Sequence, residues 1–162
     1  MDFHEAVKQV RAMPQFKHLP KTCHLAHAFV MKENEGEEWQ IGYFCPDTDR
    51  MISFIVDEEV HQLPPAEVLK SDIAIKTLDP ANVKISAEEA LAIAEKVRLD
   101  HYKASMPMKT FFLIQHLPEG TVYNLTYVTR QFTTLNIKID AKDGTVVKHS
   151  NEPLISFDKG GK

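Results

Sequence analysis

The residues best suited to chemistry in this chain are its two cysteines and the histidines near the first of them. Cys23 and His24 begin a short segment that reaches His27, and Cys45 lies further along the chain. Thiolate and imidazole groups are ligands that zinc prefers in proteins. If residues 23–31 form one strand of a hairpin centred near Asn34, then Cys23, His27 and Cys45 approach one another on one face. These three residues are the weak candidates for a metal site.

The same face would also carry Trp39, Ile41 and Tyr43, and this composition is typical of a hydrophobic core. We therefore favour two buried thiols and a core or rim histidine over a metal site, and we expect no cofactor. A disulfide between Cys23 and Cys45 is geometrically possible, but it is expected only if the protein is exported.

The acidic residues have positions that favour structural roles. Asp2 and Glu5, and likewise Ser86 and Glu89, have the spacing of a helix capping box, which accounts for them without catalysis. The acids at the turns lack the glycine that a calcium loop requires and predict a solvated face. They are Asp47, Asp49, Asp57, Glu58 and Glu59.

Large aromatic and methionine side chains concentrate in a few segments. The segment from Thr110 to Ile114 is apolar on both faces, which indicates a strand covered on both sides. We expect either that two sheets pack on each other or that a partner covers one outer face. Core packing is the favoured interpretation, and a partner or ligand surface is the alternative. The candidates for that surface are Trp39, Tyr43, Met106, Met108, Phe112, Tyr123 and Tyr127.

The chain also repeats itself at a spacing of 84 positions. At this spacing Asp2 matches Ser86, Trp39 matches Tyr123 and Tyr43 falls on Tyr127. A repeat of helix start and strand pattern predicts two copies of one unit. We divide the chain into a first repeat at 1–63, a structured linker at 64–84, and a second repeat with the C-terminal tail at 85–162.

Each copy is predicted to be a helix followed by an antiparallel strand meander, which defines an α+β fold of two tandem units. Helices are expected to begin after Asp2 and after Ser86, and Pro14 is expected to end the first. In the linker we expect a short helix and a bridging strand with Ile73, Ile75 and Leu78. The expected strands span residues 23–31, 38–45, 50–57, 110–117, 121–128, 133–140 and 145–148.

The second copy resembles the PepSY domain family. The run Val83–Lys96 is similar to the opening of these domains, and Leu135–Val147 is similar to their closing hairpin. The likeness covers 83–149, and it reaches the first copy only through the repeat. It implies a cystatin-like helix on an antiparallel sheet, no cofactor and a non-catalytic role. PepSY domains occur in propeptides of thermolysin-like metallopeptidases and in cell-envelope proteins.

Composition narrows the class of protein. The net charge is −4 and the pI is near 6.0, and we interpret the lysines as scattered among acids, which argues against nucleic-acid binding. Apolar stretches are strand-sized, so no membrane span is expected. The first residues lack the features of a signal peptide, which predicts a cytoplasmic protein unless a leader has been removed.

Three functions remain open. We favour a non-catalytic protein-binding or regulatory module, with peptidase regulation as one form of it and a protein as the partner. A small-molecule or lipid carrier is the alternative, and it requires an apolar cavity between helix and sheet. An enzyme dependent on cysteine and histidine is the least favoured, because it needs an exposed thiol with a lowered pKa.

Overall fold

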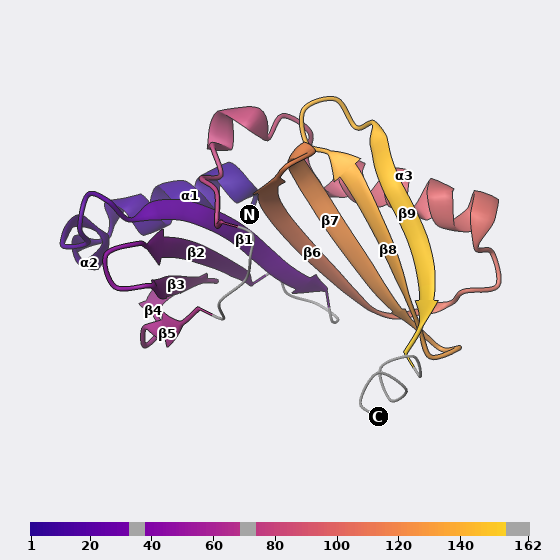
Figure 1. The fold of residues 1–162 in the computed structure, drawn as a ribbon, viewed down its shortest axis with the longest axis horizontal. Helices are drawn as coiled ribbons and strands as arrows, with labels where there is room; N and C mark the ends of the chain where they lie inside the picture. Colours follow the sequence, from indigo (N-terminus) through magenta and orange to yellow (C-terminus); the bar gives the residue numbers. More distant parts are fainter. Residues whose placement is uncertain (33–37, 69–73, 155–162) are drawn as a thin grey trace.

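The computed structural model describes residues 1–32, 38–68 and 74–154, and it shows one twisted antiparallel sheet with helices on one face (Figure 1). The strand order is β4-β3-β2-β1-β6-β7-β8-β9, and β5 pairs with β3. The predicted α+β class is confirmed. The elements are α1 (Phe3–Ala12), α2 (Pro14–Lys17), β1 (His24–Lys32), β2 (Trp39–Cys45), β3 (Arg50–Val56), β4 (Val60–Gln62), β5 (Ala66–Glu67), the 3-10 helix η1 (Pro80–Asn82), α3 (Ala87–His101), β6 (Pro107–Leu117), β7 (Gly120–Thr129), β8 (Thr133–Asp140) and β9 (Val146–Pro153).

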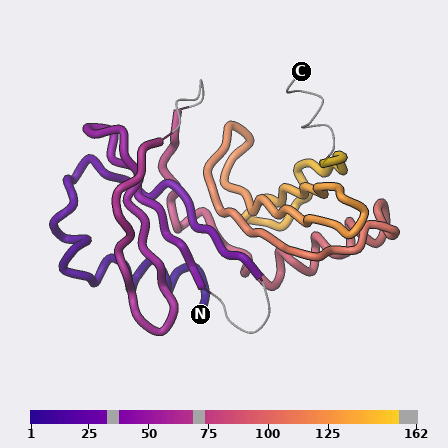
Figure 2. The backbone as a smooth tube through the Cα atoms, turned by 90° about the horizontal axis from the view of Figure 1, so that it is seen from below, coloured from indigo at the N-terminus to yellow at the C-terminus, as the bar shows by residue number. Residues whose placement is uncertain are grey.

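The two halves of the chain join edge to edge. In the first half α1 is followed by β1 to β4, and in the second α3 is followed by β6 to β9. Strand β1 pairs with β6 from His27 opposite Gln115 to Lys32 opposite Thr110. Figure 2 shows the two halves side by side. The expectation that two sheets pack face to face is therefore wrong. Edge pairing instead satisfies the backbone groups of two strands that would otherwise be exposed edges.

The helix starts follow the sequence pattern. Ser86 and Glu89 form a complete capping box, in which the Glu89 N–H donates to the Ser86 hydroxyl and the Ser86 N–H donates to the Glu89 carboxylate. Asp2 caps α1 by accepting the Glu5 N–H, but the Glu5 carboxylate accepts from the Gln9 side chain instead of reaching back. After α1 the chain forms a short second helix with Pro14 at its first position. This second helix was not predicted from the sequence.

One hydrogen bond recurs in both halves at the 84-residue spacing. The Trp39 indole N–H donates to the Met1 carbonyl at 3.1 Å, and the Tyr123 hydroxyl donates to the Ile85 carbonyl at 2.8 Å. In each half an aromatic residue of the central sheet thus holds the residue before the helix cap. This equivalence supports the proposal that the two halves are repeats; their superposition stays a prediction.

The linker lies against the first half. Leu78 is buried, and its N–H donates to the Leu25 carbonyl at 2.8 Å. In the described part of residues 64–84, the expected short helix and bridging strand are absent; β5 and η1 are found instead. Ile73 lies outside the described residues, as do the predicted hairpin turn near Asn34 and the tail from residue 155 onward. The linker therefore supplies side chains to one end of the first half.

Candidate binding groove beside the disulfide

Cys23 and Cys45 form a disulfide that joins the start of β1 to the end of β2. The expectation of two free buried thiols is therefore wrong. The predicted hairpin did bring the two cysteines together, and at that distance a bond forms between their sulfur atoms. Because neither sulfur is a thiolate, neither serves as a zinc ligand or as a nucleophile. The cysteine-dependent enzyme thereby loses its nucleophile.

His27 lies on the opposite face of the sheet from Tyr43, contrary to the expectation that they share one face. The pairing of β1 with β2 shifts register between Leu25 and His27, because Ala26 is an extra residue in β1. The shift turns His27 to the face opposite the helices, and its ring lies over Gly42, where an added Cβ would overlap the imidazole. Burial lowers the pKa of His27. The three candidate metal ligands are therefore not brought together.

Most of the aromatic residues proposed for a partner surface belong to the core. Five of the seven candidates are at most 2% exposed and pack beneath the helices. They are Trp39, Tyr43, Phe112, Tyr123 and Tyr127. Met106 and Met108, in contrast, are 47% and 54% exposed near the start of β6. The favoured interpretation of the aromatics as core agrees with these positions.

The cavity that a lipid carrier would need does not form around these residues. Trp39 and Tyr123 line a hollow of about 170 Å³ between the first turns of α1 and α3. Acids and bases also line this hollow, so it is small and rich in charged groups; they are Asp2, His4, Lys84, Glu88 and Glu89. Typical ligand pockets are larger and mostly apolar. The arrangement does not favour a carrier of apolar molecules.

A larger depression lies at the end of the first half, around the disulfide. Two adjoining hollows of about 260 and 380 Å³ share Phe16 and Cys23 in their walls. Tyr43 lines the larger hollow and packs edge-on against the Phe16 ring, with 5.0 Å between the two ring centroids. We call these two hollows the disulfide groove. Its remaining lining residues are Arg11, Lys17, Leu19, Pro20, Lys21, His24, Leu25, Thr77, Leu78, Asp79 and Pro80.

The rim of the disulfide groove is basic. Arg11, Lys17 and Lys21 line it and are exposed. Of its neighbouring acids, Asp79 accepts the Ala81 N–H, and Asp47 accepts the Thr22 hydroxyl at 2.7 Å. Both carboxylates are thus already hydrogen-bonded. A cationic rim over an apolar floor suits a ligand that is both acidic and partly apolar.

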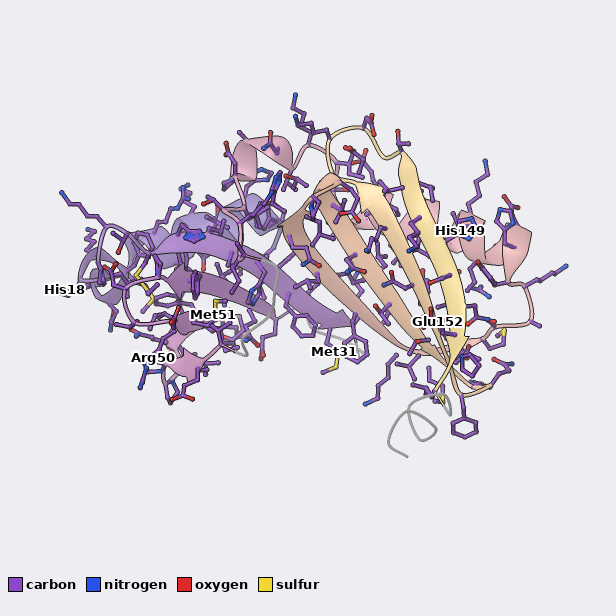
Figure 3. All side chains as sticks on the ribbon, in the orientation of Figure 1. His18, Met31, Arg50, Met51, His149 and Glu152 are labelled. Carbon is purple, nitrogen blue, oxygen red and sulfur yellow. A yellow bond between two sulfur atoms is a disulfide. The ribbon has the colours of Figure 1, made fainter. Side chains whose placement is uncertain are left out.

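The sequence carried a signal for this rim that the sequence analysis missed. Residues 6–32 contain five Lys and Arg and no Asp or Glu. The other 135 residues therefore hold 14 of the 19 basic residues and all 23 acids. The interpretation that the lysines are scattered among acids is wrong for this segment. Figure 3 shows the disulfide at the same end of the molecule as His18, in the middle of the acid-free segment.

One wall of the groove contains a buried polar atom. The hydroxyl of Tyr43 is buried and has no hydrogen-bond partner of acceptable geometry among the described residues. Burial raises the pKa of Tyr43, and the positive charge of Arg11 opposes that rise. The equivalent hydroxyl in the second half, that of Tyr127, is also buried and has no hydrogen-bond partner of acceptable geometry within residues 1–32, 38–68 and 74–154.

None of the helices in the described ranges is long and apolar enough to cross a membrane.

Comparison with known proteins supports the fold alone. No family model and no curated protein matches the chain. Among solved structures, the chain is similar to a "putative lipoprotein" from Clostridium difficile 630, with a TM-score of 0.65 and 13% identity over 94% of this chain and 93% of the other. The C-terminal domain of Bacillus megaterium YpeB matches with a TM-score of 0.28 and 13% identity over 94% of this chain and 98% of that domain. At this level of identity, the first likeness shows that the two chains share an α+β architecture.

Proposed function

We propose that this protein is a non-catalytic protein-binding module that resembles tandem PepSY domains. Its partner presents an extended acidic segment with one apolar side chain, and the disulfide groove binds that segment. The observation that carries the proposal is the combination of an apolar floor at Phe16 with a rim of Arg11, Lys17 and Lys21. The apolar side chain gains affinity by leaving water, and the charges orient the segment.

The disulfide favours an oxidising compartment as the place where the module works. Structural disulfides persist in secreted and envelope proteins and are rare in the cytosol. The expectation of a cytoplasmic protein is therefore not supported, and we propose an extracytoplasmic location. Mass spectrometry after alkylation tests the bond: the purified protein should accept two alkyl groups only after reduction.

A peptide library tests the proposed ligand class. Random ten-residue peptides displayed on phage are selected against the whole protein and, in parallel, against the K17E/K21E variant. Selection on the wild type should enrich peptides with several Asp or Glu residues around an aromatic or aliphatic residue. The double variant should lose these peptides, because its rim is reversed in charge while the apolar floor is kept.

A matched control separates the groove from the general charge of the protein. Lys142 and Lys103 lie outside the groove, so K103E/K142E changes the net charge by the same amount as K17E/K21E. The control variant should retain the selected peptides. Enrichment of the same peptides on all three proteins, or of none on the wild type, would contradict the proposed groove.

The non-catalytic part of the proposal needs its own measurement. The resemblance to PepSY domains suggests peptidase regulation, so the protein is added to a thermolysin-like metallopeptidase and also assayed alone against broad hydrolase and peptidase substrates. Turnover by the protein alone that disappears in a single histidine variant would refute the binding-module function, even if the groove binds peptides.

A further inference from the structure

Strand β9 is the last strand at one edge of the sheet, no strand of the described residues pairs with its outer side, and it is longer than expected. The sequence predicted a strand over residues 145–148, but β9 extends from Val146 to Pro153 and pairs with β8. At the other edge, β4 and β5 contain three and two residues, and such short strands offer little to a partner. Figure 1 shows β9 as the last strand of the sheet, with α3 in the layer behind it.

The register between β8 and β9 shows which backbone groups of β9 point away from β8. The Leu154 N–H donates to the Phe132 carbonyl at 2.8 Å, so this pair is hydrogen-bonded. In an antiparallel ladder such pairs alternate with pairs that are not hydrogen-bonded. Counting back from this pair, Glu152, Ser150 and Lys148 bond to β8. His149 and Asn151 therefore direct their N–H and C=O groups to the open edge.

The side chains of β9 are complementary to a second copy of the same strand. Suppose that two β9 strands run antiparallel about a twofold axis at Ser150. Lys148 then lies opposite Glu152 of the other copy, and His149 lies opposite its Asn151. In an isologous contact of this kind each pair occurs twice. The charges of Lys148 and Glu152 are thus complementary between the two copies, while the side chains of His149 and Asn151 keep their contacts with Tyr102 and Ser105 in their own chain.

The structure of a single chain leaves the charge of Lys148 poorly balanced. Lys148 lies opposite Lys138 in β8, and Lys138 has its own ion pair with Glu119 at 3.8 Å. Like charges on neighbouring strands destabilise a sheet. An acid from a second copy would relieve this repulsion at the open edge. On the helix side of the sheet, Nδ1 of His149 is hydrogen-bonded to the Tyr102 hydroxyl at 2.7 Å, and this bond fixes the orientation of the imidazole ring.

From these observations we infer that two copies of this chain associate through β9, in antiparallel register about Ser150, to form one continuous sheet. Pro153 lacks an N–H and limits the pairing to about five residues on each chain. The contact is smaller than that of a stable dimer, which buries about 1,200–2,000 Å². The association is therefore a concentration-dependent equilibrium. It does not depend on the disulfide groove, which lies in the first half.

Disulfide trapping tests the register directly. Because His149 and Asn151 would form the hydrogen-bonded pairs, Ser150 would face Ser150 of the other copy as a pair without hydrogen bonds, with Cβ atoms about 4.5–5.5 Å apart. Under mild oxidation S150C should form a covalent dimer rapidly, because the wild type has no free cysteine to compete. N151C is the matched control and should crosslink at least about tenfold more slowly, since its Cβ faces residue 149.

Charge exchange tests the energetics by sedimentation at increasing protein concentration. K148E and E152K should each weaken self-association by about tenfold or more, because each places like charges opposite one another twice. K148E/E152K should restore it, and K142E should leave it unchanged. N151P should abolish the association, because the N–H that it removes points to the open edge. The variant also loses the hydrogen bond from the Asn151 side chain to the Ser105 hydroxyl, so circular dichroism checks that its fold is kept.

Two results would overturn the inference. The first is that the wild type stays monomeric up to about 1 mM and that S150C forms covalent dimers no faster than N151C. The other is a dimer whose stability is the same in the single and double charge variants. Either result would leave the proposal for the disulfide groove intact, since peptide selection there uses residues of the first half.

Discussion

Removal of the disulfide should destabilise the protein by an amount that follows from its loop length. The bond joins residues separated by 22 positions. In the chain-entropy model, closing a loop of this length lowers the entropy of the unfolded chain enough to stabilise the fold by about 3.5 kcal/mol at 25 °C. For 162 residues the entropy of unfolding near the midpoint is about 0.34 kcal/mol per kelvin. The C23S/C45S variant should therefore unfold about 10 °C below the wild type.

The assay is thermal and urea unfolding, followed by circular dichroism, of the wild type and C23S/C45S with and without reductant. Reductant should lower the midpoint of the wild type to that of the variant and leave the variant unchanged. This control separates loss of the bond from the effect of the two serines. A difference below about 1 kcal/mol between oxidised and reduced wild type would refute the reasoning, because the bond would then not constrain the unfolded chain.

Three further predictions concern packing and protonation in the sheet. G42A should destabilise by about 1–3 kcal/mol in urea unfolding, because the new methyl group would overlap the His27 ring; an unchanged midpoint would contradict the close contact. Y123F should lower the free energy of unfolding by about 1 kcal/mol, because it removes the hydrogen bond to the Ile85 carbonyl. Y127F should lower it by less, because the Tyr127 hydroxyl makes no hydrogen bond among the described residues, and equal losses in the two variants would contradict this difference. Since burial lowers the pKa of His27, the unfolded state binds more protons than the folded state, so the free energy of unfolding should fall as the pH drops below about 6.5. H27Q should reduce the dependence of that free energy on pH, and an unchanged dependence would contradict the role of His27.

Helices, strands and turns could be predicted from the sequence where patterns of neighbouring residues determine them. The predicted strand over residues 133–140 matches β8, and Ser86 is the N-cap of α3, as its capping box indicated. Asp140 ends β8 and accepts the Lys142 N–H at 2.7 Å, and Gly144 has the positive φ of 79° that its turn requires. These features depend on residues only a few positions apart in the chain, so the sequence alone contains the information.

Features that depend on distant contacts were not predictable in the same way. Nothing near Ala26 marks it as an extra residue in β1, and that residue decides which face His27 occupies. The pairing of β1 with β6 brings together strands from opposite halves of the chain, and their apolar patterns were equally compatible with two packed sheets. The disulfide depended on the compartment, which the sequence near Cys23 does not encode. The basic rim could have been found from the acid-free segment 6–32.

The differences between the two halves indicate where function lies. Arg11 and Glu95 occupy equivalent positions at the 84-residue spacing, and each influences the pKa of the equivalent tyrosine in its own half. Glu95 is paired with Arg98 at 2.9 Å, and Arg98 also donates to the Ser105 carbonyl, so the second half satisfies its charges internally.

In the first half Pro14 stands where the second has Arg98, and it begins the separate helix α2. Arg11 therefore has no equivalent internal ion pair among the described residues, and Phe16 from α2 lines the groove beside it. The hydrogen bonds of Trp39 and Tyr123 keep one scaffold in both halves. A shared scaffold with a reversed charge and a broken helix in the first half supports the proposal that this half binds a partner while the second half maintains the fold.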